Sequence, residues 1–463
     1  MCAPRSARAS GADYNAIFDG AAGGPAGAAS PHLRRVLAAS LPPPTPMPTR
    51  PSKSRPAARA SASHPVEHAL AALSGRDLSD AAIAAHVAPL FSRHRKAYAG
   101  RIYLANHSLG RPLDATADDV AEGLAHWYAA MGGAWDAWEA EMRAYRARLA
   151  GLLGVPRADS VVPKTSAAQG LRAVLNSCDG RPRVVATRGE FDSLDVVLRE
   201  YARRGRIALV LIEPRADGRF DTADVLAAVG TGCDLVVVSE VVFTTGQRLD
   251  GLADIVAVAH AQGARVLVDV YHSLGVVPQE HADTGVDFVV GGCYKYLRGG
   301  PGACFLYVHP RHLDAGLRTL DTGWFAKDAP FSYARPDPPV FAAGGDGWLE
   351  STPPVLPFYQ ARAGQIFVKS VGVERLRAHS LARQRELVDC LAARGIAALG
   401  GTEDRGAFVV VRDLRAVALA DAASARGVVC DARGEWLRLC PDVLSTGAEL
   451  AAAAGGLAEV MRG

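Results

Sequence analysis

The sequence lacks the marks of a membrane protein and of a secreted protein held together by disulfides. Its 463 residues contain no apolar run that reaches the roughly 20 residues of a membrane-spanning helix. Eight cysteines are present without a CxxC pair, so neither a disulfide framework nor a structural zinc site is expected. The first residues also lack the apolar core of a signal peptide. We therefore expect a cytoplasmic protein that holds no metal ion and binds no membrane.

An excess of charge of one sign is also lacking. The chain carries 51 lysines and arginines against 48 aspartates and glutamates, which gives a net charge of +3. A protein this close to neutral has no broad basic field, so we expect no nucleic-acid partner. Hydrophobic residues make up 49% of the chain, which suffices for a large buried core. The length allows roughly two or three domains.

The first 63 residues differ from the rest in composition. They contain ten prolines, and eight basic residues outnumber two acidic ones. Such a segment cannot bury enough apolar surface to offset its chain entropy, so we predict a disordered tail over 1–63. Two interpretations stay open: a functional anchor or transit-like peptide, or a solvated extension that results from a translation start placed too far upstream.

Short apolar runs alternate with amphipathic stretches beyond residue 150. The runs are four to ten residues long and rich in valine, isoleucine and leucine, which is typical of strands buried on both faces. Two of the intervening stretches, 193–204 and 252–262, have helical periodicity. This alternation predicts an α/β fold with a mainly parallel sheet covered by helices. The predicted strands are 184–187, 207–213, 234–243, 266–270, 288–291 and 303–309.

The outer parts of the periodic chain follow other patterns. Residues 65–98 and 359–394 each predict a helix, while the proline- and glycine-rich stretch 328–357 predicts a long loop. Two short apolar runs, 407–412 and 436–439, indicate a small α+β domain. We therefore divide the chain into a tail over 1–63, an N-terminal arm with the large domain over 64–330, and the loop with the small domain over 331–463.

Two charged residues stand at the carboxyl ends of predicted strands, where ligands bind in open α/β sheets. Asp269 lies at the end of the run 266–270 and is followed by Tyr271 and His272. A carboxylate on a buried strand needs a partner, although it can also cap a following helix. Lys295 follows the next predicted strand, 26 residues after Asp269. Burial lowers the pKa of a lysine amine and makes it a nucleophile, although a lysine at a strand end can equally lie on the surface.

Asp269 and Lys295 together fit the needs of pyridoxal 5′-phosphate. The ring nitrogen of this cofactor takes a carboxylate partner, and its aldehyde takes a lysine amine. The carboxylate keeps the ring nitrogen protonated, so that the ring can take up electrons from a carbanion. We therefore expect pyridoxal phosphate as the cofactor.

Further motifs surround these two residues and extend along the chain. They are Asp269-Val-Tyr-His272, Gly285-Val-Asp-Phe288, Tyr294-Lys-Tyr-Leu297, Gly300-Pro-Gly302, Thr245-Gly-Gln247, Asn106-His-Ser-Leu-Gly110 and Gly323-Trp-Phe325. These motifs resemble those of the kynureninase family, which belongs to the class V aminotransferase group of fold-type I pyridoxal phosphate enzymes. The resemblance covers roughly residues 100–460 and is strongest over 240–325. It implies a large domain with a mainly parallel, seven-stranded sheet and a small C-terminal α+β domain.

The resemblance assigns roles to the residues nearest the cofactor. Lys295 corresponds to the lysine that forms the Schiff base, and Asp269 corresponds to the partner of the ring nitrogen. His272 matches a histidine close to the cofactor. Tyr294 matches a tyrosine that binds the phosphate and is a candidate proton donor, although it can also be a packed strand residue.

Further cofactor contacts are implied at two helix starts. Phe191 resembles the aromatic residue that stacks on the cofactor ring, with Ser193 as a nearby polar contact. Without the resemblance, Phe191 would be interpreted as a core residue. The family's phosphate cup corresponds to Ser166 and Ala167, with Thr165 as a second source of a hydroxyl group. A helix N-terminus suits phosphate, although serine or threonine there can serve as a simple cap.

Other segments resemble parts of the family's site that bind the substrate or reach a neighbouring subunit. Trp324 and Thr352 lie in segments that resemble those reaching into the active site of the neighbouring subunit. Thr352 stands where the family has an asparagine. Arg438 resembles the arginine that grips the α-carboxylate of the substrate, a task that suits a bidentate guanidinium. Nearby Arg433 is an alternative for this role. Asn106 and His107 are further candidates for substrate contacts.

The function that the resemblance implies is a hydrolysis. A homodimer with shared active sites would cleave the Cβ–Cγ bond of L-kynurenine to give anthranilate and L-alanine, a step of tryptophan catabolism. The substrate ring stays open, because 3-hydroxykynurenine or another aryl- or acyl-alanine fits the same motifs. Other class V reactions, namely transamination and cysteine desulfuration, are alternatives. A non-catalytic ligand sensor that keeps the fold is a further alternative, which the Asp269 and Lys295 pair disfavours.

Overall fold

The computed structural model describes residues 63–230, 232–279 and 281–462. The disordered tail predicted over 1–63 therefore lies outside the described residues, except for residue 63. Within the described ranges, no helix combines the length and the apolar character that crossing a membrane requires.

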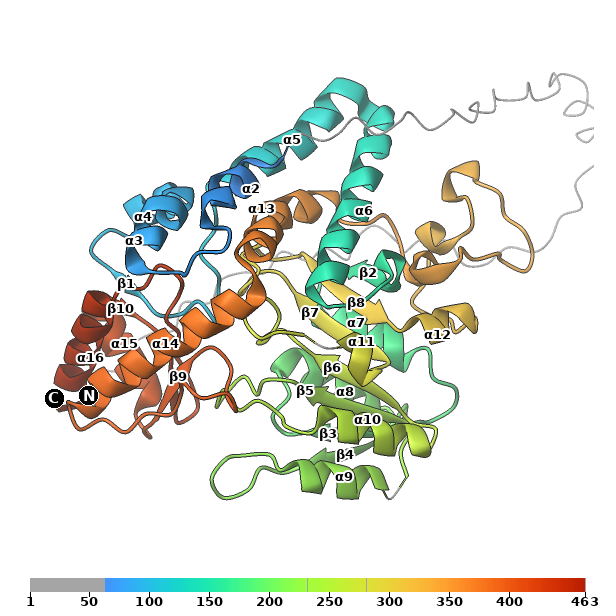
Figure 1. Ribbon diagram of the computed structural model, residues 1–463. Coiled ribbons are helices and arrows are strands. Elements are labelled where there is room, and N and C mark those ends of the chain that lie inside the picture. The colour runs from blue at the N-terminus through green and yellow to red at the C-terminus, as the bar shows by residue number, and fades with distance from the viewer. Residues whose placement is uncertain (1–62, 231, 280, 463) are drawn as a thin grey trace, which may run out of the picture. The chain divides into compact units, whose positions relative to one another are not determined.

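A seven-stranded sheet forms the centre of the fold (Figure 1), in the order β2-β8-β7-β6-β5-β3-β4. Neighbours from β7 to β4 run parallel, whereas β8 runs antiparallel to both β7 and β2. This sheet confirms the predicted α/β fold with a mainly parallel, seven-stranded sheet. The strands are β2 (Val161–Lys164), β3 (Arg183–Thr187), β4 (Ala208–Ile212), β5 (Leu235–Ser239), β6 (Arg265–Asp269), β7 (Phe288–Gly292) and β8 (Cys304–Val308).

Helices cover both faces of this sheet, because successive side chains of its strands point to opposite sides. Val236 and Val268 pack into one core with helices α6, α9, α10 and α13, whereas Val237 and Leu267 pack into a second core with α7 and α8. The continuous apolar runs of the sequence follow from this two-sided burial. The covering helices are α6 (Trp135–Leu152), α7 (Ala167–Leu175), α8 (Asp192–Arg203), α9 (Thr222–Gly230), α10 (Leu252–Ala261) and α13 (Val355–Val371).

The C-terminal part builds a smaller antiparallel sheet with the order β11-β12-β9. Helices α14, α15 and α16 pack on it around a core of their own. A two-residue strand of the N-terminal arm, β1, pairs with β10 and ties residues 102–105 to this part of the molecule. The elements are β1 (Ile102–Tyr103), β9 (Val409–Arg412), β10 (Val428–Val429), β11 (Asp431–Arg433), β12 (Trp436–Leu439), α14 (Val373–Ala392), α15 (Ala416–Ala425) and α16 (Gly447–Arg462).

Two of the predicted helices are broken in the structure. The prediction over 359–394 is divided between α13 and α14, because Gly372 between them adopts a left-handed φ of 93°. The prediction over 65–98 becomes a series of short helical pieces. The pieces are α2 (Pro65–Leu70), η1 (Ala71–Leu73), α3 (Asp80–Ala82), η2 (Ile83–Val87), η3 (Ala88–Phe91) and α4 (Ser92–Ala97).

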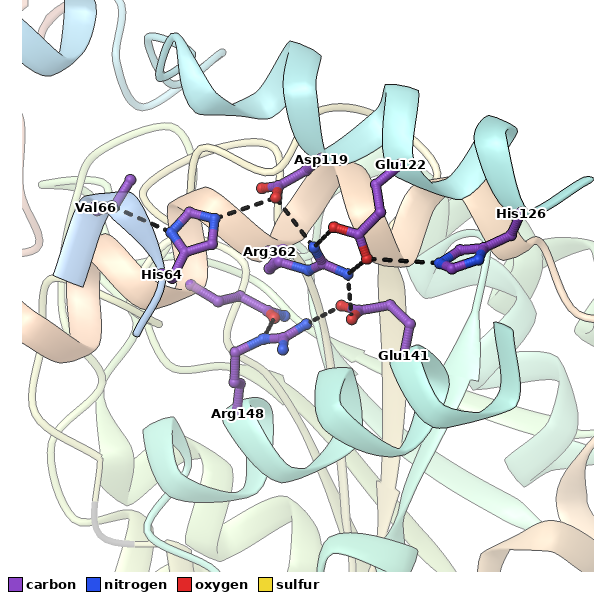
Figure 2. Close-up of polar contacts among 9 residues, drawn as sticks. His64, Val66, Asp119, Glu122, His126, Glu141, Arg148 and Arg362 are labelled. Atoms are coloured by element: carbon purple, nitrogen blue, oxygen red, sulfur yellow. Dashed lines mark hydrogen bonds and ion pairs between the residues drawn. The ribbon is translucent and has the colours of Figure 1, made fainter. Parts of the chain in front are cut away.

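A network of charged side chains joins the helices around α13 (Figure 2). Arg362 of α13 reaches Asp119 at 3.2 Å and Glu122 at 2.7 Å, both on α5 (Ala115–Ala130), and Glu141 of α6 at 2.6 Å. His64 extends the network, since its Nε2 lies 3.1 Å from Asp119 while its Nδ1 accepts the N–H of Val66 and caps α2. This network fixes α2, α5 and α6 against α13.

The loop predicted over 328–357 contains two short helical turns and no strand of the sheets described above, but its end is wrong, because α13 already begins at Val355. The two turns are η7 (Pro330–Ser332) and η8 (Gly344–Trp348), and η6 (Trp324–Ala326) precedes them. The remaining short helices are α11 (His281–Thr284), α12 (Pro310–Asp314), η4 (Met131–Ala134) and η5 (Ala158–Ser160).

Candidate active site

The amine of Lys295 is the centre of the site. The chain leaves β7 at Gly292 and turns inward, which leaves Lys295 only 4% exposed. Its Nζ lies 2.5 Å from Nε2 of His272. Burial lowers the pKa of Lys295, and the negative charge of Asp269 only partly offsets this effect. An amine of this kind is unprotonated more often than an exposed lysine and serves as a nucleophile.

Asp269 is the last residue of β6, the strand beside β7. Its side chain is buried, and Oδ1 accepts the backbone N–H of Tyr271 at 2.7 Å. Burial raises the pKa of this carboxyl, while the bond from Tyr271 and the charge of Lys295 act in the opposite direction. Parallel strands place their carboxyl ends at one edge of the sheet, which is why two residues 26 positions apart meet here.

A second buried carboxyl, Glu190, was not predicted from the sequence. It accepts the hydroxyl of Thr187 at 2.7 Å and the hydroxyl of Ser239 at 2.6 Å, and Ser239 pairs with Asp269 across β5 and β6. Burial raises the pKa of Glu190 to about 7, and the charge of Asp269 adds to this shift. An acidic residue directly before Phe191 was the only signal in the sequence that could have identified it.

Aromatic rings surround the amine of Lys295. The ring centres of Tyr271, Phe191 and Tyr294 lie 4.9, 5.5 and 5.8 Å from Nζ. Tyr271 and Tyr294 also contact each other, with their centres 5.0 Å apart. The structure thus brings the predicted residues Phe191 and Tyr294 to Lys295, together with Tyr271, to which the sequence assigned no role.

Two buried histidines stand beside this group, with their ring centres 6.4 Å apart. His107 holds the carboxylate of Asp431 at 2.8 Å through Nε2, which leaves its Nδ1 as an acceptor. In the described part of the chain, Nδ1 of His107 and Nδ1 of His272 have no hydrogen-bond partner. Burial lowers the pKa of His107 to about 4 and holds the pKa of His272 well below its usual value, so both rings are neutral at pH 7.

Arg438 of β12 lies opposite Asp431 of β11 in the antiparallel register. Its Nε and Nη2 donate to the two carboxylate oxygens of Asp431 at 2.8 and 2.6 Å, and Nη1 donates to the carbonyl of Phe243 at 2.5 Å. The side chain of Arg438 is 2% exposed, while those of Asp431 and Arg433 are 20% and 43% exposed. Arg438 is therefore a guanidinium held rigidly along one edge, and Arg433 is the more accessible cation.

The segment from Asn106 to Gly110 is brought to the site by the N-terminal arm. Gly110 donates its N–H to the carbonyl of Tyr294 at 2.7 Å, and the Ser108 hydroxyl donates to Asp431. Asn106 faces elsewhere, because its Oδ1 accepts from Arg298 at 3.4 Å beside the buried Asp442. Of the two predicted substrate contacts in this segment, His107 thus lies beside the Lys295 group and Asn106 beside the Arg298–Asp442 pair.

The residues predicted for the phosphate lie at the start of α7. The Ser166 hydroxyl caps this helix by accepting the N–H of Gln169 at 3.1 Å, and Ala167 is its first residue. The Thr165 hydroxyl donates to the side chain of Gln169 at 3.1 Å. Ser193 lies in the first turn of α8, next to Phe191, which stands at that helix's N-cap. Both helix starts supply the backbone N–H groups that suit an anion.

Trp324 and Thr352 lie together, with Nε1 of Trp324 donating to the Thr352 hydroxyl at 3.2 Å. In the described ranges, no hydrogen bond, ion pair or ring contact joins either residue to Lys295. A second buried lysine, Lys164, is paired with Glu350 at 2.7 Å. Burial lowers the pKa of Lys164 as well, and the hydrogen bond with Glu350 acts in the opposite direction. Lys295 therefore differs from Lys164 in having no carboxylate within ion-pair distance in the described residues.

Comparison with known proteins gives matches of three kinds. The family model for class V aminotransferases matches residues 111–426. A kynureninase from Xanthomonas oryzae pv. oryzae (strain PXO99A) is 40% identical over 180 residues, which is 37% of this chain and 41% of that relative. A kynureninase from Xanthomonas campestris pv. campestris (strain B100) is 37% identical over 179 residues, with the same shares of both chains. The chain thus matches about two fifths of the length of these curated relatives.

Solved structures are similar in fold at low sequence identity. The cystine C–S lyase C-DES in complex with cysteine persulfide has a TM-score of 0.71 at 19% identity, covering 79% of this chain and all but 1% of the lyase. The cysteine desulfurase CsdA from Escherichia coli has a TM-score of 0.66 at 16% identity, covering 80% of this chain and 98% of the desulfurase. At these identities the likeness concerns the fold alone.

The residues of the site fit a ligand that carries an aldehyde, a ring nitrogen and a phosphate. Lys295 offers a buried amine with a lowered pKa, and Asp269 offers a carboxylate at the neighbouring strand end. Phe191 and Tyr271 offer flat apolar surfaces beside the amine, and α7 offers its N-terminus. Nδ1 of His272, which is buried and has no hydrogen-bond partner among the described residues, is a further sign that the group of residues is completed by a ligand.

Proposed function

The chain belongs to the class V aminotransferase family, and on that premise we propose that it hydrolyses the Cβ–Cγ bond of L-kynurenine or a related aryl- or acyl-alanine. Its cofactor is pyridoxal 5′-phosphate. The products would be anthranilate, or the corresponding acid, and L-alanine. The 40% identity with curated kynureninases over 180 residues is the observation that favours this reaction over others of the family.

The cofactor, when bound, supplies an aldehyde for an amine and a ring that takes up electrons. We assign its aldehyde to Lys295 and its ring nitrogen to Asp269, whose carboxylate holds a proton on that nitrogen. The N-terminus of α7 with Thr165, Ser166 and Ala167 would hold the phosphate, and Phe191 and Ser193, at the start of α8, would contact the ring. The free amine of Lys295 would accept the α-proton of the substrate at Nζ, because its lowered pKa keeps a larger share of the amine unprotonated.

Two tyrosines lie close enough to Lys295 to take part in proton transfer, and their surroundings distinguish them. The hydroxyl of Tyr271 is engaged with Sγ of Cys304 at 3.1 Å, and burial holds the pKa of this hydroxyl well above its usual value. Burial also raises the pKa of Tyr294, but the hydroxyl of Tyr294 has no protein partner in the described residues that would hold it away from a ligand. We assign proton donation to the alanyl fragment to Tyr294.

The α-carboxylate of the substrate is assigned to Arg438. A guanidinium carries five N–H groups, and Asp431 occupies only the edge formed by Nε and Nη2. Nη1 also donates to the carbonyl of Phe243, and Nη2 lies 3.5 Å from the Ser108 hydroxyl. We assign the second carboxylate to the edge formed by Nη1 and Nη2, where each nitrogen carries two N–H groups. Asp431 thus orients the guanidinium of Arg438. The neutral His107 and the Ser108 hydroxyl in turn hold the carboxylate of Asp431 in place. Arg433 is the alternative for this role.

We further propose a cytoplasmic homodimer. Trp324 and Thr352 make no contact with Lys295 within the described residues of their own chain, so their proposed place is the site of the partner subunit. The proposed partners are this second copy and a small amino-acid substrate, without nucleic acid or membrane.

A cysteine desulfurase or C–S lyase reaction is the second candidate, because solved structures of such enzymes share the fold. Cys293 and Cys304 are the cysteines nearest Lys295 in sequence, and such a reaction would need a thiolate. Burial raises the pKa of Cys293 to about 12 and that of Cys304 to about 11, which keeps both thiols protonated at pH 7. This observation ranks desulfuration behind hydrolysis, while transamination, which needs no thiolate, stays an alternative.

The experiment that tests the proposal is a turnover assay with L-kynurenine. The protein is loaded with pyridoxal phosphate, and the release of anthranilate is followed by its fluorescence, with Lys295→Ala as the inactive control. Release that requires Lys295 supports the hydrolysis. A loaded protein that releases no anthranilate but converts another amino acid rules out kynurenine as the substrate and directs the assay to cysteine and to amino-group acceptors.

A further inference from the structure

Of the phenylalanine and tyrosine rings around the amine of Lys295, the ring of Tyr271 is the nearest. Its centre lies 4.9 Å from Nζ, closer than Phe191 at 5.5 Å and Tyr294 at 5.8 Å. Tyr271 is partly exposed, and its side chain packs against the edge of the core that contains Val237 and Leu267. A ligand attached at Nζ therefore has the imidazole of His272 in contact with Nζ and the ring of Tyr271 as the nearest of the phenylalanine and tyrosine rings.

Two neighbours fix the ring of Tyr271 in this position. Its hydroxyl forms a hydrogen bond with Sγ of Cys304, at 3.1 Å, on the strand β8. The hydroxyl also passes directly over Gly292 of β7, where any Cβ atom would collide with it. Asp269 adds a third restraint, because its carboxylate accepts the backbone N–H of Tyr271 at 2.7 Å. Residues of strands β6, β7 and β8 thus hold the side chain of Tyr271 in one position.

This arrangement gives the hydroxyl of Tyr271 a structural task. The hydroxyl is directed at Cys304, and its raised pKa makes it a poor proton donor at neutral pH. What the residue offers to the site is the face and edge of its ring, which remain beside Nζ. Aromatic surfaces of this kind stabilise a flat ring held against them.

We propose that Tyr271 is a second aromatic wall of the cofactor site, in addition to Phe191, and that Gly292 and Cys304 serve to position it. Tyr271 is a positioning residue for the cofactor ring and not a proton donor. The proposal rests on cofactor binding at Lys295 and is independent of the substrate, so its test remains valid whether or not L-kynurenine is hydrolysed.

The test measures the affinity of the cofactor-free protein for pyridoxal phosphate, by visible absorbance, and the visible circular dichroism of the bound cofactor. Tyr271→Phe keeps the ring and is expected to stay within about 2-fold of the wild-type dissociation constant. Tyr271→Leu removes the ring and is expected to weaken binding about 3- to 10-fold and to reduce the dichroic band. Tyr128→Leu is the matched control, because Tyr128 is 83% exposed and outside the site, and it should leave both readouts unchanged.

Gly292→Ala provides an independent test of how the ring of Tyr271 is positioned. The new methyl group displaces the ring of Tyr271, so this variant should weaken cofactor binding while all side chains of the site are retained. Combined with Tyr271→Leu, it should weaken binding no further than Tyr271→Leu alone. Wild-type affinity and an unchanged dichroic band in Tyr271→Leu overturn the proposal. If Tyr271→Leu does not fold, wild-type affinity in Gly292→Ala overturns it.

Discussion

Replacing Arg438 by glutamine tests the assignment of the substrate carboxylate. The change removes the Nη1–Nη2 edge that would receive this carboxylate, and it leaves the negative charge of Asp431 without its bidentate partner. Both effects disfavour a second carboxylate, so they act in the same direction. A hydrogen bond to a charged group contributes about 1.5–3 kcal/mol, which corresponds to a rise in KM of about 10- to 150-fold.

The assay is steady-state release of anthranilate, with KM and kcat determined separately for L-kynurenine. We expect most of the effect in KM, because the carboxylate is bound equally in the ground state and the transition state. Arg433→Gln is the matched control: its side chain is 43% exposed, and an exposed charge pair contributes little, so KM should rise less than about 5-fold. A larger rise in KM for Arg433→Gln than for Arg438→Gln would refute the assignment and identify Arg433 as the carboxylate contact. Thermal unfolding of both variants controls for loss of fold.

Three further predictions concern the proton donor, the ionic network and pH. Tyr294→Phe should lower kcat about 100-fold or more while cofactor absorbance is retained, because general acid catalysis contributes about 10²–10⁴-fold; equal losses in Tyr294→Phe and Tyr271→Phe would contradict the assigned donor. Arg362→Leu should lower the free energy of unfolding by about 2 kcal/mol, measured in urea, because it removes the cation shared by buried carboxylates. The loss stays moderate because Asp119 keeps His64 as a partner and Glu141 keeps Arg148. Arg203→Leu on the surface is the control and should leave the urea midpoint unchanged. His107 has a folded pKa of about 4 against 6.5 when exposed, so the unfolded chain binds the extra proton and stability falls as the pH drops from 6.5 toward 4. His107→Gln should remove up to about 1.4 kcal/mol per pH unit of this slope, and an unchanged slope in urea unfolding would contradict the burial of a neutral imidazole.

The strand pattern could be predicted because burial on both faces leaves a direct trace in the sequence. The run 266–270 corresponds to β6 and the run 184–187 to β3, within one or two residues. The edge strand β2 was missed, because it contains Pro163 and Lys164, which interrupt the apolar pattern. An edge position accommodates a proline, since one side of the strand has no partner for its N–H.

The meeting of Asp269 and Lys295 could also be predicted, since parallel strands align their carboxyl ends. The ion pair between Arg438 and Asp431 could not, because it depends on the register of the hairpin formed by β11 and β12. The same holds for Glu190, whose partner Ser239 comes from β5, and for Tyr271, whose ring is placed by Gly292 and Cys304. Contacts between elements leave no periodic signal in the sequence of either one.

The breaks in the predicted helices have a similar cause. Periodicity continues across Gly372, but the left-handed backbone of this residue separates α13 from α14. In the N-terminal arm, the short pieces from Pro65 to Ala97 keep apolar residues at helical spacing while following the surface of the core. Spacing alone predicts which side chains are buried, and it does not predict where the helix axis bends.

The most direct test of the account is to locate the cofactor on the chain. Borohydride reduction of the protein loaded with pyridoxal phosphate fixes the cofactor on the amine that holds it, and peptide mass spectrometry then identifies that lysine. We predict a single adduct on Lys295, whose buried amine has a lowered pKa and no carboxylate within ion-pair distance in the described residues. An adduct on the buried Lys164, which is paired with Glu350, or no specific adduct at all, would contradict the central claim.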